Sequence, residues 1–169
     1  MRVAYIDHPP QSPTDLNPVS PEKRDQVSGP GLKAFLAITR AWGLTEKDQR
    51  ILLGEPGRST YFGWIKKAQN NQRLSLSLDT LLRISAVLGI HKALKILFVE
   101  EAEAMIWLKG PHHGQPFAGQ APLDVMLNGT QDDLMTVRRY LDAWRGGLDG
   151  GPSRENPIQP VRVEDIVWA

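Results

Sequence analysis

The residue types that most often catalyse hydrolysis or bind metals lie close together in one part of this sequence. His112 and His113 are followed by Asp124, Asp132 and Asp133. Adjacent histidines project in different directions, and no third ligand follows at the spacing of a zinc or acid–base site. The sequence also has no cysteine, which excludes disulfide bonds and thiol catalysis. We therefore expect no enzymatic activity, no metal site and no cofactor.

A second group of side chains suits binding to nucleic acid. The segment "RSTYFGWIKKAQ" at residues 58–69 begins with an arginine and three hydroxyl side chains and ends with two lysines. Arginine can contact guanine with two hydrogen bonds, while hydroxyl groups and lysines suit phosphates. The predicted DNA-binding residues are Arg58, Ser59, Thr60, Tyr61, Lys66, Lys67 and Arg73. The alternative is a solvated helix whose Tyr61, Phe62 and Trp64 fill a core, and spacing alone favours neither.

The charges are unevenly distributed along the chain, although the net charge is only +1. Residues 33–83 contain nine Lys or Arg and four Asp or Glu, whereas residues 99–134 contain one Lys and six acidic residues. This asymmetry predicts one surface for a polyanion and a different surface for another partner, with ordinary solvated faces as the alternative.

Helical periodicity dominates the middle of the chain and predicts an all-α fold. Residues 29–98 are expected to form a bundle of about five helices. Its first helix ends at Gly43, Thr45 caps a short second helix that ends at Gly54, and residues 58–69 form the third. Two short helices around a glycine-containing turn have helix-turn-helix spacing. Ser77 opens a fourth helix that is expected to end near Gly89, with a fifth following it.

A second module of three short helices is expected at residues 99–147. Its middle part, "PFAGQAPLDVMLNG", runs from Pro116 to Gly129 and contains no obvious nucleophile. Pro122 suits the first turn of a helix, and Thr130 suits the cap of the last one. We interpret this loop and short helix as a shaped binding surface, because a loop that is braced by Leu123 and Leu127 on a short helix can present a rigid surface at a low ordering cost.

The ordered set of motifs over residues 30–147 resembles the Xre/MbcA/ParS antitoxin family. The matching residues are Thr60 and Trp64 in the third helix, the pair Trp107 and Leu108, and Phe117, Gly119, Pro122, Leu123 and Gly129 in the loop and helix that follow. Two features depart from the family pattern. Gly63 stands where a basic residue is common, and "PHHGQ" replaces a shorter Pro-Asn loop.

This resemblance implies an Xre-like helix-turn-helix domain followed by a toxin-binding domain. It implies an antitoxin of a type II toxin–antitoxin system that neutralises a RES-domain, NAD-consuming toxin and binds its own promoter DNA, as a homodimer within a larger complex. Trp107, Phe117 and Leu123 are the expected toxin contacts, with burial in the module's own core as the alternative for the two aromatic residues. The competing hypothesis is a stand-alone repressor whose C-terminal module only mediates oligomerisation.

The two ends of the chain have a different composition. Residues 1–28 are rich in proline and polar residues, which predicts a flexible arm. Residues 148–169 are expected to be a linker and a tail that docks through its apolar end, with Arg162, Glu164, Asp165 and Trp168 as toxin contacts. A disordered tail, or one folded on the last helix, is the alternative. No signal peptide or transmembrane run is evident, so we expect a soluble cytoplasmic protein without membrane contact.

Overall fold

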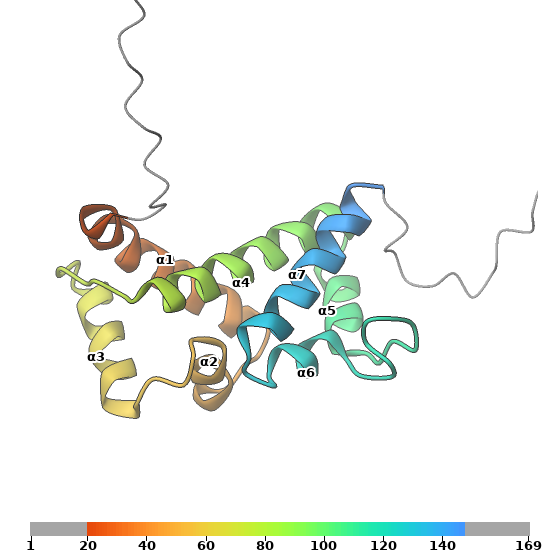
Figure 1. Cartoon of the computed structure of the whole chain (residues 1–169), viewed down its shortest axis with the longest axis horizontal. Helices are drawn as coiled ribbons and strands as arrows, with labels where there is room; N and C mark the ends of the chain where they lie inside the picture. The colour runs from red at the N-terminus through yellow and green to blue at the C-terminus, as the bar shows by residue number, and fades with distance from the viewer. Residues whose placement is uncertain (1–19, 148–169) are drawn as a thin grey trace, which may run out of the picture.

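The computed structural model describes residues 20–147, and within this range the chain forms seven helices and no strand (Figure 1). The all-α prediction is confirmed. The helices are α1 (Pro21–Ala41), α2 (Glu46–Leu52), α3 (Arg58–Gln69), α4 (Leu78–Leu97), α5 (Glu101–Lys109), α6 (Pro122–Met126) and α7 (Gln131–Arg145). None of the helices in this range is long and apolar enough to cross a membrane.

Helix α1 begins at Pro21, inside the segment that was predicted to be a flexible arm up to residue 28. The Ser20 hydroxyl accepts a hydrogen bond from the Lys23 amide at 3.4 Å, and proline occupies the first helical position, where it loses no helical hydrogen bond. The prediction is wrong for residues 21–28, because a proline-rich and polar composition does not prevent a helix whose first turn is capped; residues 1–19 lie outside the described residues. Pro30 also lies inside this helix, between Gly29 and Gly31.

Helices α2 and α3 have the predicted helix-turn-helix arrangement, with a five-residue connection between them. Gly54 and Glu55 in this connection both have positive φ angles, of 89° and 58°. Such a backbone turns the chain sharply, and it is easiest for glycine. The two helices therefore leave the turn in different directions, and α3 lies at the edge of the molecule (Figure 1).

Helix α4 runs without interruption from Leu78 to Leu97, so the predicted stop near Gly89 is wrong. Gly89 instead allows the side chain of Arg138 to pack closely against the helix. A Cβ atom at Gly89 would lie 1.6 Å from Nη1 of Arg138. Arg138 on α7 crosses α4 at this point and donates to the Ser85 carbonyl at 3.3 Å. Residues 21–97 consequently contain four helices, not five.

Helices α5, α6 and α7 form the predicted three-helix unit, but this unit shares one hydrophobic core with the preceding helices. Helix α7 lies along α4 (Figure 1), and the buried side chains of α4 include Val87, Ile90 and Leu94. The guanidinium of Arg83 on α4 also donates to the Gly129 carbonyl at 2.9 Å. Helix α4 therefore belongs structurally to both halves of the molecule.

Candidate nucleic-acid and protein interfaces

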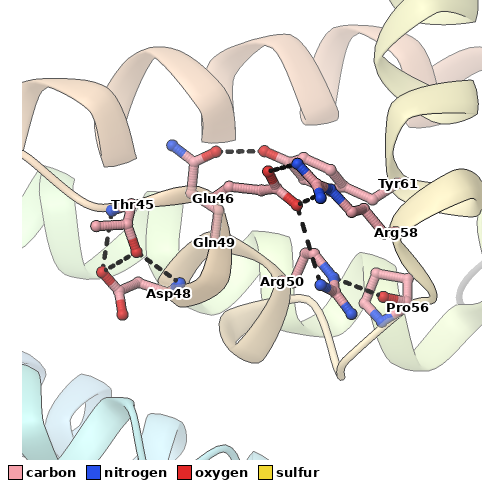
Figure 2. A network of polar contacts seen from close by, with 8 residues as sticks. All are labelled: Thr45, Glu46, Asp48, Gln49, Arg50, Pro56, Arg58 and Tyr61. Carbon is pink, nitrogen blue, oxygen red and sulfur yellow. Dashed lines mark hydrogen bonds and ion pairs between the residues drawn. The ribbon is translucent and has the colours of Figure 1, made fainter.

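The start of α2 is held by a capping box at the predicted cap, Thr45 (Figure 2). The Asp48 amide donates to the Thr45 hydroxyl at 3.2 Å, and the Asp48 carboxylate accepts from the Thr45 amide at 2.9 Å. This residue pair therefore gives an acceptor to two backbone amides, those of Thr45 and Asp48, which have no partner within the helix. The start of a helix as short as α2 is fixed by this local chemistry.

Side chains of α2 also fix the position of α3 (Figure 2). Arg58 forms a two-point ion pair with Glu46, with distances of 3.1 and 3.3 Å. Arg50 donates to the Pro56 carbonyl in the turn at 2.9 Å. The Tyr61 hydroxyl donates to the Gln49 side chain. The angle between the two helices is therefore set by polar contacts as well as by apolar packing.

Tyr61 is buried, so it is not available to contact DNA as the sequence had suggested. Burial raises the pKa of its phenol, because the charged form would lose solvation. Phe62, which the alternative interpretation places in a core, is 46% exposed. The buried residues of this helix are Tyr61 and Ala68.

The exposed side of α3 carries most of the remaining predicted DNA contacts. Arg58, Ser59, Thr60, Lys66 and Lys67 are all exposed, and no acidic residue occurs anywhere in α3. Residues four apart share a helix face, so Arg58, Phe62 and Lys66 form one row. The structure thus brings these basic side chains together on the second helix of the helix-turn-helix, with Glu46 of α2 beside Arg58 at its start.

Arg73 lies apart from this row, in the loop that follows α3. It forms an ion pair with Asp25 on α1 at 2.6 Å, although its side chain remains 85% exposed. A hydrogen bond from the Ser75 side chain, together with the Arg73 guanidinium, holds the pKa of Asp25 below its usual value. Arg73 therefore ties this loop to α1 while its exposed surface faces solvent.

The expected toxin contacts Trp107, Phe117 and Leu123 are all buried. The Trp107 ring stacks on Tyr140 at 6.0 Å, and Phe117 meets Tyr140 edge-on at 4.9 Å between ring centroids. These aromatic residues fill the core of the second half, which was the alternative interpretation. They support the surface residues of this half, but little of their own area is exposed to a partner.

The exposed apolar residues near this core are different ones, which the sequence analysis did not single out. Val99 is 95% exposed and Ile106 is 73% exposed. They border two neighbouring grooves that share Phe98, with volumes of about 250 and 520 Å³. We call Phe98, Val99, Ile106 and Pro111 the α4–α5 face. Its rim carries the acidic residues Glu100, Glu101 and Glu103.

The weak signal for this face was the pair of apolar residues at positions 99 and 106. Ile106 follows helical spacing, so the sequence places it in the core equally well. Only the way in which α5 packs leaves it outside.

His112 and His113 lie in the loop between α5 and α6. The His112 ring contacts the Trp107 carbonyl through Nε2 at 2.8 Å and lies against Phe117. No group of three or more potential ligands that could hold a metal occurs between residues 20 and 147. His112 thus braces the loop over the aromatic core.

Comparison with known proteins identifies the second half of the molecule. Residues 93–147 match the family described as the antitoxin Xre/MbcA/ParS C-terminal toxin-binding domain. The chain belongs to the Xre/MbcA/ParS antitoxins. It is also 47% identical over 116 residues to the uncharacterized protein y4oB of Sinorhizobium fredii (strain NBRC 101917 / NGR234), an alignment that covers 69% of this chain and 84% of that relative.

The family match extends from the last turns of α4 to the end of α7. It includes the α4–α5 face, the aromatic core and the loop that carries Phe117. The predicted toxin contacts Arg162, Glu164, Asp165 and Trp168 of this antitoxin lie outside the described residues. A toxin is accordingly the partner that this domain implies.

Proposed function

We propose that this protein is the antitoxin of a type II toxin–antitoxin system, that it neutralises a RES-domain toxin that consumes NAD, and that it represses its own promoter. The observation that carries the proposal is the match of residues 93–147 to a toxin-binding domain, because the same residues expose an apolar surface. The RES-type toxin is suggested by the resemblance of residues 30–147 to antitoxins that are paired with such toxins.

The α4–α5 face is our candidate for the toxin contact. Apolar side chains surrounded by charged residues are the usual arrangement of a protein interface, and a 95% exposed valine gains from burial. The acidic rim favours a partner with basic residues around an apolar contact. The aromatic core beneath the face gives it a fixed shape.

Co-purification tests this contact. The full-length chain and a RES-domain protein encoded in the same genome are co-expressed, and the complex is isolated through a tag on the toxin. We expect Val99→Asp combined with Ile106→Asp to abolish co-purification and to restore NAD consumption. Val27→Asp is the matched control, because Val27 is 47% exposed but lies on α1, outside the toxin-binding domain. Retention of the complex by the double variant would exclude this face.

The tail at residues 148–169 is a second candidate for toxin contact, supported only by its apolar sequence. Deleting residues 156–169 separates binding from inhibition. Retained binding with restored NAD consumption would identify the tail as the inhibitory element, and unchanged inhibition would contradict this role.

The basic face of α3 is our candidate for promoter binding. Its amides at the first turn have no side-chain cap, so they are available to phosphate, and Arg58 and the two lysines supply positive charge. We expect Arg58→Ala to weaken specific binding by about 1–3 kcal/mol, and Lys66→Ala to flatten the salt dependence. Equal affinity of wild type and the triple Arg58, Lys66 and Lys67 variant for promoter DNA would contradict this assignment.

The alternative is a stand-alone repressor in which residues 99–147 only mediate oligomerisation. It predicts promoter binding without a toxin partner. In that case the α4–α5 face variants would change the mass of the free protein in light scattering, and no RES-domain protein would co-purify.

A further inference from the structure

Phe62 is an unusual residue for the exposed face of a helix that carries no acidic residue. Its ring is 46% exposed, although burial of an aromatic ring is strongly favourable. The ring occupies the middle of the row formed by Arg58 and Lys66. A contact that buries Phe62 would therefore also bring both cations to the same partner.

The Phe62 ring is held in place from two sides. Tyr61 meets it edge-on, with 5.4 Å between ring centroids. The Arg58 guanidinium lies over the ring, 5.7 Å from its centroid. Arg58 is itself fixed by its two-point ion pair with Glu46 (Figure 2). The arginine and the ring thus form one ordered unit on the helix surface.

The next position, Gly63, leaves space beside the ring. Apart from its two chain neighbours and the backbone of its own helix, no heavy atom would lie within 4 Å of a Cβ atom added there. A groove wall or a base edge can consequently approach Phe62 without a steric conflict from its neighbour on the exposed side. Gly63 has no basic side chain that could bind phosphate. The same lack of a side chain gives a partner access to the Phe62 ring.

An aromatic ring has no hydrogen-bond donor or acceptor for a base edge. What it can recognise in the major groove is the C5-methyl group of a pyrimidine, while a neighbouring arginine reads the O6 and N7 atoms of guanine. We propose that Phe62 makes the protein selective for a C5-methylated pyrimidine next to a guanine, with Arg58 as the guanine contact. This inference rests on the proposed DNA binding and specifies its sequence preference.

The C5-methyl group occurs in thymine and in 5-methylcytosine, and the experiment distinguishes them. Duplexes are first selected from a random pool by the full-length protein. At the selected position, affinities are then compared for thymine, uracil, cytosine and 5-methylcytosine. We expect loss of the methyl group to weaken binding about fourfold, the effect of burying one methylene-sized group. The same change at an uncontacted position is the control.

Two variants test whether Phe62 is responsible. Phe62→Ala should bind the thymine and uracil duplexes equally, and it should fold normally because the ring is half-exposed. Lys66→Ala should weaken binding to both duplexes by the same factor, because it contacts phosphate. If the protein prefers thymine over uracil but does not prefer 5-methylcytosine over cytosine, the methyl group that it recognises is that of thymine. If both preferences are equal, it recognises the C5-methyl group on either base.

Three outcomes would overturn the inference. Selection of no duplex at all would remove the proposed DNA binding and the inference with it. Salt-dependent DNA binding that ignores the methyl group would refute the inference alone and leave promoter binding intact. A change in the mass of the free protein caused by Phe62→Ala would assign the ring to a contact between two copies of the chain.

Discussion

Two glycines inside helices have opposite surroundings, and they illustrate how single residues act here. Gly63 is open, whereas Gly89 lies against the Arg138 side chain. Arg138 also donates to the Asp142 carboxylate at 2.7 Å, so its position is fixed from both sides of its guanidinium. Glycine costs an ordinary helix about 1 kcal/mol relative to alanine. At Gly89 this cost is offset by the close contact that it permits.

We therefore expect Gly63→Ala to raise the free energy of unfolding by about 0.5–1 kcal/mol, because no atom opposes the added methyl group. Gly89→Ala should give no such gain, since Arg138 must move and lose its contact with Ser85. In an Arg138→Ala background, Gly89→Ala should become as favourable as Gly63→Ala. Urea unfolding of the four variants checks this. If the changes in the free energy of unfolding caused by the Gly89 and Arg138 substitutions simply add in the double variant, the contact between the two residues is disproved.

At the scale of elements, the first turns of α1 are held by the loop that joins α3 to α4. The Ser28 hydroxyl is fully buried, donates to the Arg24 carbonyl at 2.6 Å and accepts from the Leu76 amide at 2.9 Å. Ser28 is thus a buried polar link between two segments 48 residues apart, in addition to the exposed ion pair between Arg73 and Asp25.

We expect Ser28→Ala to lower the free energy of unfolding by about 1–3 kcal/mol, because the buried Leu76 amide would lose its acceptor. Ser59→Ala is the control: Ser59 is exposed on α3, and its replacement should change stability by less than about 0.5 kcal/mol. Hydrogen exchange of the Leu76 amide reports the same contact directly. Unchanged exchange in the Ser28 variant would show that the amide is protected by something else.

At the scale of the whole molecule, the helix-turn-helix half and the toxin-binding half form one packing unit. Val87, Ile90 and Leu94 of α4 are at most 1% exposed, and α7 lies along this helix. A Cβ atom at Gly129, before α7, would lie 3.3 Å from Ile51 on α2. The two halves thus share a helix and also touch through α2.

We expect the full-length protein to unfold in a single transition, with tryptophan fluorescence and circular dichroism giving the same midpoint. Trp42 reports on the first half, and Trp107 and Trp144 report on the second. A fragment of residues 1–98 should lack cooperative unfolding, because it loses the α7 surface that covers α4. Two separate transitions, or a fragment as stable as the intact chain, would show that the halves fold independently.

The sequence by itself determined the helices whose ends carry local signals. Thr45 and Thr130 cap α2 and α7 as predicted, and α3 spans the predicted residues, because capping and turn formation depend on residues within a few positions. The toxin-binding domain was also recognisable, because its motifs keep a fixed order along the chain. These features need no information about distant contacts.

Only the tertiary structure decided which side chains remain exposed. Tyr61 and Phe62 are neighbours of similar character, yet one is buried against Gln49 and the other faces solvent. Phe117 is buried and Ile106 is exposed for the same reason, since burial depends on how helices pack and not on local composition. Gly89 resembles a helix stop until Arg138, 49 positions later, is placed beside it. Contacts between segments that are distant in sequence thus fixed the surfaces of this antitoxin.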